Sequence, residues 1–195
     1  MKVKVCGITD AKDAAMCEEL GADALGFVHV EGRTRSLPLD QIADVCSTLG
    51  PMTTKVLVCS PMSKDEALRL FERAEADVLQ LHSLEPMDVQ CLKDEGVRLI
   101  RAVRPDRAEA SRFVESVDAL LFESGEPGTG RAYDYSRVPV SVCKRPIIAG
   151  GLNLNNMRSA IAMNPYALDV SSGVEDASGK KDPDLVAQFV ARCKE

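Results

Sequence analysis

Two side chains that can carry protons stand at the ends of short apolar runs. Cys6 ends the run KVKVC, and Glu123 lies near the end of DALLFES. A helix pattern begins by Asp10, and a helix N-terminus stabilises the thiolate that makes cysteine a base. A carboxylic acid in apolar surroundings stays protonated and can donate its proton. The two residues could act as general base and general acid, although an inert thiol and a salt-bridged glutamate are the alternatives.

Two loops of small residues are typical of a phosphate site. Gly150 and Gly151 lie in AGGLN, and Ser171, Ser172 and Gly173 lie in SSGVE. Small residues let backbone N–H groups approach an anion closely, and a following helix N-terminus adds a favourable dipole. Glycines alone could simply form tight turns. Two such loops after consecutive apolar runs favour a phosphate ligand.

Three further polar residues are site candidates. Arg35 in GRTRSLPLD could bind a carboxylate or phosphate through two N–H groups, or it could be a solvated loop cation. Gln80 and His82 close the run DVLQLH. Spacing alone identifies no partner for His82 or for the second histidine, His29.

Composition limits the class of protein. The chain has 195 residues, 45% of them hydrophobic, and a net charge of −6, which fits one globular domain over residues 1–195 and argues against nucleic-acid binding by bulk attraction. We expect no membrane span, because the longest apolar runs are far too short. Seven widely spaced cysteines without a CxxC pair predict reduced thiols in a cytoplasmic protein and no structural metal.

Strand and helix patterns alternate along the chain. The strand candidates are near-continuous apolar runs, which are typical of parallel strands covered on both faces: 2–6, 23–30, 54–60, 77–82, 97–103, 118–124, 145–151 and 166–172. The helix patterns lie between them, at 10–20, 39–49, 63–74, 86–95, 107–117, 153–163 and 182–195. The segment 131–144 predicts only a short helix or an irregular crossover after the sixth strand.

Eight such units predict a compact α/β fold, a single (β/α)₈ TIM barrel with short loops. Periodicity alone leaves an open doubly wound sheet as the alternative. Both architectures bind ligands at the carboxyl ends of their strands, and the candidate residues above all lie there.

Several motifs occur in an order that resembles one known family. They are KVCGIT (4–9), GADALGFV (21–28), QLH (80–82), PGTGRAYDY (127–135), IIAGGLN (147–153) and LDVSSGVEDASGKKD (168–182). Together they cover nearly the whole chain and resemble phosphoribosylanthranilate isomerase, an enzyme of tryptophan biosynthesis.

The resemblance implies a metal-free and cofactor-free (β/α)₈ barrel. Its reaction is the Amadori rearrangement of N-(5-phosphoribosyl)anthranilate to 1-(2-carboxyphenylamino)-1-deoxyribulose 5-phosphate. By motif, Cys6 is the general base, Arg35 binds the anthranilate carboxylate, and the two small-residue loops bind phosphate. The implied partner is this small molecule, with no nucleic acid or membrane, and the chain is expected to be a monomer or homodimer.

One departure from the resemblance concerns the acid. The family usually carries Asp where this chain has Glu123, and the following loop differs at Glu126 and Pro127. A misplacement of about 1 Å can cost 10²-fold in rate. We favour a working isomerase with a glutamate acid over a relative with shifted or lost activity, because the other site segments are intact. A different phosphate-binding barrel, such as a ribulose-phosphate epimerase, would leave KVCGIT unexplained, and a non-catalytic phosphate binder is the remaining alternative.

Overall fold

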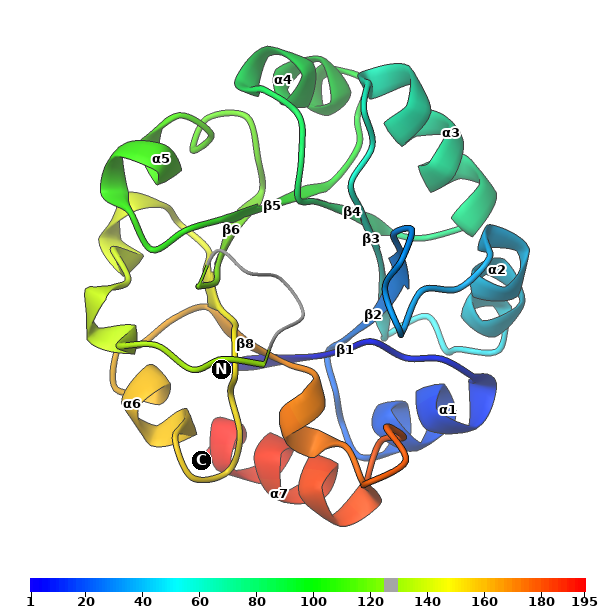
Figure 1. Ribbon diagram of the computed structural model, residues 1–195, viewed down its shortest axis with the longest axis vertical. Coiled ribbons are helices and arrows are strands. Elements are labelled where there is room, and N and C mark those ends of the chain that lie inside the picture. The colour runs from blue at the N-terminus through cyan, green and yellow to red at the C-terminus, as the bar shows by residue number, and fades with distance from the viewer. Residues whose placement is uncertain (125–129) are drawn as a thin grey trace.

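Eight parallel strands form a closed ring in the computed structural model, which describes residues 1–124 and 130–195 (Figure 1). The strands are β1 (Lys2–Cys6), β2 (Ala24–His29), β3 (Thr54–Cys59), β4 (Val78–Leu81), β5 (Leu99–Val103), β6 (Ala119–Phe122), β7 (Pro146–Ile148) and β8 (Ala167–Val170). Each strand pairs with the next in the sequence, and β8 pairs with β1, with Val5 opposite Val170. This closure confirms the predicted barrel and rules out the open sheet.

Helices surround the ring on its outside (Figure 1). They are α1 (Ala11–Glu19), α2 (Leu39–Ser47), α3 (Lys64–Ala74), α4 (Pro86–Asp94), α5 (Arg107–Ser111), α6 (Met157–Ile161) and α7 (Pro183–Lys194). The described residues also form three short 3₁₀ helices: η1 (Tyr135–Arg137), η2 (Val140–Val142) and η3 (Ser172–Val174). The poorly formed helix predicted after the sixth strand is confirmed, since η1 and η2 take its place. In the described part of the chain, none of the helices is both long and apolar enough to span a membrane.

Helix ends follow local hydrogen-bonding chemistry. Ser63 and Asp182 cap α3 and α7, because their side chains accept hydrogen bonds from Glu66 N and Leu185 N. α6 is shorter than predicted and does not begin at Asn153. The Asn153 side chain accepts from the backbone of Asn155 and Asn156 instead, so an asparagine turn replaces the first helical turn.

α5 also ends earlier than predicted. Beyond Ser111 the chain continues in turns whose hydrogen bonds span three residues, with Phe113 N donating to Ala110 O and Ser116 N to Phe113 O. These tighter turns place the Phe113 ring in the core, where it is 2% exposed. Burial of that ring therefore replaces continuation of the helix.

The strands separate two apolar layers. Val3 and Val5 point outward and pack in the layer between strands and helices. Lys4 and Cys6 alternate with them and point into the barrel, as strand geometry requires. The same alternation turns the last inward residues of the strands toward one mouth of the barrel, so these residues determine the chemistry there.

Candidate active site

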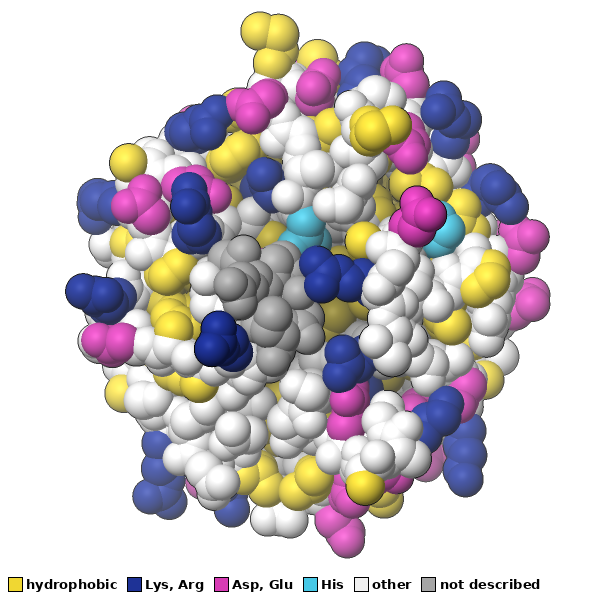
Figure 2. Space-filling model, viewed as in Figure 1, with side chains coloured by type: hydrophobic (Ala, Val, Ile, Leu, Met, Phe, Trp, Pro, Cys, Tyr) yellow, Lys and Arg dark blue, Asp and Glu magenta, His cyan; other side chains and the backbone are white. Residues whose placement is uncertain are grey.

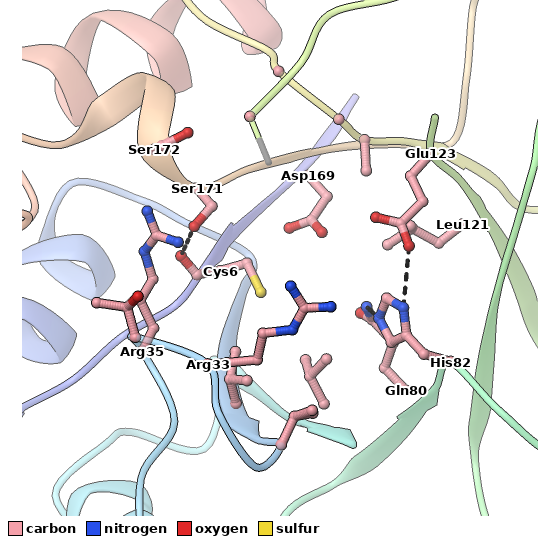
Figure 3. A pocket seen from close by; sticks show the side chains of 18 of the residues that line it. Cys6, Arg33, Arg35, Gln80, His82, Leu121, Glu123, Asp169, Ser171 and Ser172 are labelled. Atoms are coloured by element: carbon pink, nitrogen blue, oxygen red, sulfur yellow. Dashed lines mark hydrogen bonds and ion pairs between the residues drawn. The ribbon is translucent and has the colours of Figure 1, made fainter. Parts of the chain in front are cut away.

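A cavity of about 290 Å³ opens at the carboxyl ends of the strands. Basic and histidine side chains gather around the hollow on this face of the molecule (Figure 2). Nine of the ten predicted site residues line it: Cys6, Arg35, Gln80, His82, Glu123, Gly150, Gly151, Ser171 and Ser172. The close-up shows Cys6 and Glu123 on opposite sides of the cavity, with Asp169 between them (Figure 3).

Cys6 lies beside a buried ion pair. The Lys4 ammonium contacts both Asp169 carboxylate oxygens at 3.0 Å, and the two residues are 2% and 8% exposed. Lys4 also hydrogen-bonds the Cys6 side chain. Gly26 on β2 makes room for this arrangement, because a Cβ there would lie 2.7 Å from Cys6 Sγ and 3.0 Å from Lys4 Nζ. The base candidate is therefore held against a fixed positive charge.

Burial and the Lys4 charge act in opposite directions on Cys6. Burial raises the pKa of the Cys6 thiol above its usual value, because a thiolate loses hydration inside the barrel. The Lys4 ammonium favours the thiolate and limits that rise. Burial also disfavours the ammonium, but Asp169 keeps the pKa of Lys4 above its ordinary value, so Lys4 stays charged. Cys6 thus depends on Lys4 for its anionic form.

Glu123 contacts a histidine on the opposite side of the cavity. Its Oε1 lies 3.0 Å from His82 Nδ1, and the two side chains are 15% and 16% exposed. The Nε2 atom of His82 lies 3.1 Å from the Gln80 side-chain nitrogen. Gln80, His82 and Glu123 thus form one hydrogen-bonded chain (Figure 3), which spacing in the sequence did not identify for His82.

Arg35 belongs to a second ion cluster at the mouth. Its Nε and Nη2 donate to the two Glu175 oxygens at 2.8 and 2.6 Å, and Lys181 Nζ donates to Glu175 Oε1 at 2.7 Å. The hydrogen bonds that Arg35 donates to Glu175 raise the pKa of Arg35. Two cations around one anion leave a net positive charge beside Cys6, which suits an anionic ligand.

Arg33 also reaches the cavity, although the sequence gave no reason to prefer it over Arg35. Its side chain lies between Cys6 and His82 in the close-up, nearer the centre of the cavity than Arg35 (Figure 3). Both arginines come from the loop after β2. The loop therefore delivers two cations to the mouth, where the sequence predicted one.

The small-residue loops are required sterically. Gly150 and Gly151 have φ values of 89° and 65°, in the region that favours glycine. A side chain at Gly151 would meet the backbone of Ala132, and one at Gly173 would meet the carbonyl of Leu152. Gly173 lets the loop after β8 pack against Leu152 in the loop after β7. Ser171 and Ser172 line the cavity, whereas Gly173 lies outside its lining.

Residues 131–135, which follow β6 in the chain, pack against these glycines. Tyr135 OH donates to the Gly150 carbonyl at 2.7 Å, and Tyr133 OH donates to the Phe122 carbonyl at 3.0 Å. The altered residues Glu126 and Pro127 lie outside the described residues. The second histidine, His29, is away from the cavity lining and has its Nδ1 2.8 Å from the Leu37 carbonyl oxygen.

Three polar residues of the site were missed from the sequence. Lys4 and Asp169 are 165 positions apart and meet only because β1 pairs with β8. Their signal was present, since each is a charged residue within a strand that is mostly apolar. Arg33 carried no comparable signal. Within the described residues, no group of three or more His, Cys, Asp or Glu side chains is placed to hold a metal ion.

Comparison with known proteins identifies the family of this chain. A family model described as N-(5'-phosphoribosyl)anthranilate (PRA) isomerase matches residues 3–192. The N-(5'-phosphoribosyl)anthranilate isomerase of Methanothrix thermoacetophila is 37% identical over 99% of this chain and 98% of its own length.

Solved structures give the same result. Phosphoribosyl anthranilate isomerase from Thermus thermophilus has a TM-score of 0.91 and 35% identity, over 100% of this chain and 98% of its own. A second such isomerase, in complex with reduced 1-(o-carboxyphenylamino)-1-deoxyribulose 5-phosphate, has a TM-score of 0.87 and 31% identity, with the same coverage. The closed barrel, its mouth and these matches over the full length show that the chain belongs to the N-(5'-phosphoribosyl)anthranilate isomerase family.

Proposed function

We propose that this chain converts N-(5-phosphoribosyl)anthranilate into 1-(2-carboxyphenylamino)-1-deoxyribulose 5-phosphate, a step of tryptophan biosynthesis, with Cys6 as base and Glu123 as acid. The observation that carries the assignment of roles is the placement of a thiol and a carboxyl group on opposite sides of one cavity of about 290 Å³. A sugar-sized substrate between them can receive a proton from one side and lose one to the other.

The proposed reaction begins on the Glu123 side. The Glu123 carboxyl group gives its proton to the furanose ring oxygen, the bond from that oxygen to C1′ breaks, and the anthranilate nitrogen supplies the electron pair for the resulting Schiff base. Glu123 is left as a carboxylate. His82, 3.0 Å away, is the nearest described hydrogen-bond partner for that charge.

The second step takes place on the Cys6 side. The Cys6 thiolate removes the C2′ proton, and the electron pair moves toward the Schiff-base nitrogen to give an enolamine, which tautomerises to the aminoketose. Lys4 supports this step because its ammonium stabilises the thiolate inside the barrel. These steps use only proton donors and acceptors, so we propose a reaction without a cofactor.

We propose that different residues bind the two ends of the substrate, the phosphate and the anthranilate carboxylate. We propose that the phosphate lies against the loops of Gly150, Gly151, Ser171 and Ser172, with Gly173 holding those loops together. The anthranilate carboxylate is assigned to Arg35, which still has Nη1 to offer after binding Glu175. Arg33 is a second candidate for that role, because its side chain lies nearer the centre of the cavity (Figure 3).

The decisive experiment measures turnover of phosphoribosylanthranilate by the purified protein. The decrease in anthranilate fluorescence reports consumption of the substrate. We expect turnover by the wild type and a kcat lower by about 10³-fold in Cys6→Ser and Glu123→Gln, with binding of a reduced product analogue retained in both. Cys91→Ser on α4 is the matched control, since that thiol lies outside the cavity lining. Analogue binding without wild-type turnover would instead support the non-catalytic alternative.

A pair of arginine variants assigns the carboxylate contact. If Arg35 binds it, Arg35→Ala raises KM by about 10- to 100-fold, as expected for loss of a charged hydrogen bond, while Arg33→Ala changes KM much less. The reverse pattern would transfer the role to Arg33.

Three coarser properties complete the proposal. Residues 1–195 act as one catalytic unit that works as a monomer or homodimer. All seven cysteines are free, which suits the reducing cytoplasm. Light scattering of the purified protein distinguishes the two oligomeric states.

A further inference from the structure

We propose that His82 is the positioning residue for the Glu123 acid, with Gln80 holding His82 in the required tautomer. The proposal rests on the proposed function, because it assigns Glu123 its proton-donating oxygen.

The barrel brings His82 and Glu123 together across a neighbouring strand. His82 follows β4 and Glu123 follows β6, with β5 between them. The inward residue of β5 near this level is Ala102, whose methyl group leaves room for contact, and the next candidate, Arg104, is exposed with its Nε bonded to Glu109. The Nδ1 and Oε1 atoms therefore meet at 3.0 Å (Figure 3).

Gln80 determines which nitrogen of His82 carries the proton. The Gln80 side chain is 2% exposed, and its amide nitrogen lies 3.1 Å from His82 Nε2. When that amide donates, Nε2 is the acceptor, so the proton of the neutral ring is on Nδ1 and points at Glu123. Gln80 Oε1 is buried without a hydrogen-bond partner among the described residues, so the contact with His82 is the side chain's one described hydrogen bond.

This arrangement orients the acid. The His82 Nδ1–H group donates to Glu123 Oε1, so the carboxyl proton sits on Oε2, the oxygen left for the substrate. After Oε2 gives its proton to the ring oxygen, the same Nδ1–H group bonds the new carboxylate. One proton moves, one C–O bond breaks, and His82 stays neutral throughout.

Side-chain length connects the two residues. An aspartate at position 123 would be shorter by one carbon–carbon bond of about 1.5 Å. Its carboxyl group would then lie well beyond hydrogen-bond distance of His82 Nδ1. Changing either residue, Glu123 or His82, should therefore remove the same interaction.

A double-mutant cycle tests the pairing through turnover. We expect His82→Leu to lower kcat by about 10- to 100-fold with little change in KM, as expected for a misplaced acid. His82→Asn, whose side-chain amide can take the place of Nδ1–H, should restore most of the activity. Glu123→Asp should lower kcat in the wild type and have little further effect in His82→Leu. Additive effects, or an unchanged kcat in His82→Leu, would overturn the proposal.

The tautomer of His82 gives a readout that does not require turnover. The chain has two histidines, so ¹⁵N spectra of the two rings can be assigned with a His29→Gln control. We expect His82 to carry its proton on Nδ1 in the wild type and to lose that preference in Gln80→Leu. An Nε2–H tautomer in the wild type would overturn the proposal, whereas absent turnover with the expected tautomer would count against the proposed function alone.

Discussion

The two sides of the barrel mouth hold their proton-carrying groups by different means. On the Cys6 side, the thiol stands against a buried pair of full charges, Lys4 and Asp169, joined by two contacts of 3.0 Å. On the Glu123 side, a partly exposed carboxyl group is held by an imidazole and an amide. A buried thiol needs a charge to become a base, whereas a carboxylic acid needs only orientation to give up its proton.

The two sides of the mouth also differ in the substitutions that they tolerate. The Lys4–Asp169 pair is enclosed, and removing either partner leaves an unpaired buried charge. The Glu123 side has an adjustable geometry, because His82 and Glu123 both sit beyond the ends of their strands. A one-methylene change of the acid can be absorbed there by a matching partner, while an equal change beside Lys4 has no such freedom.

Removal of the base is expected to have the largest effect. Cys6→Ala should lower kcat by about 10³-fold, within the range that a positioned base contributes. Substrate binding should be retained, because the small-residue loops and Arg35, which we propose bind the substrate, are untouched. Steady-state kinetics with the Cys91→Ser control measures this effect. A Cys6→Ala protein with more than a tenth of wild-type kcat would show that another group takes the proton.

Removal of the Lys4 charge should have a smaller effect, confined to the Cys6 side. Because Lys4 limits the rise in the pKa of Cys6, Lys4→Met should move Cys6 alkylation by iodoacetamide to higher pH and slow it about tenfold at fixed pH. Peptide mass spectrometry identifies Cys6 among the seven thiols.

Two further variants control for charge and for stability. Lys2 is an exposed lysine on the same strand as Lys4, and it pairs with Asp23. Lys2→Met should leave the alkylation profile unchanged. Lys4→Met combined with Asp169→Asn removes both charges of the buried pair and so avoids an unpaired buried carboxylate. An unchanged profile in Lys4→Met would remove Lys4 from the account.

The smallest predicted effect is that of a substitution in the Arg35 cluster. It changes the stability of the protein and not its turnover. Burial disfavours the charged Glu175, but hydrogen bonds from Arg35 and Lys181 outweigh it, so the pKa of Glu175 is lowered. A lowered folded-state pKa stabilises the protein above the unfolded value of about 4.3, and this contribution is lost as pH falls through the folded value. Glu175→Gln should cost about 2 kcal/mol of unfolding free energy at pH 7 and much less at pH 3 in urea titrations. An equal cost at both values would contradict the assignment.

Many of the individual site residues could be predicted from the sequence, but their contact partners could not. Apolar runs located the strand ends and therefore Cys6, Glu123 and the two small-residue loops. The partners could not be predicted, because they depend on ring closure: Lys4 meets Asp169 only through the pairing of β1 with β8. Likewise, His82 reaches Glu123 because the intervening strand offers only Ala102. The asparagine turn that shortens α6 depends on side-chain bonds that periodicity does not report.

The measurement that tests the account most directly is the deuterium isotope effect with substrate labelled at C2′. If Glu123 opens the ring and Cys6 removes the C2′ proton, Cys6→Ser makes proton removal limiting and shows a full primary isotope effect on kcat. Glu123→Gln makes ring opening limiting and shows none. The same isotope effect in both variants would contradict the division of labour between the two sides of the mouth.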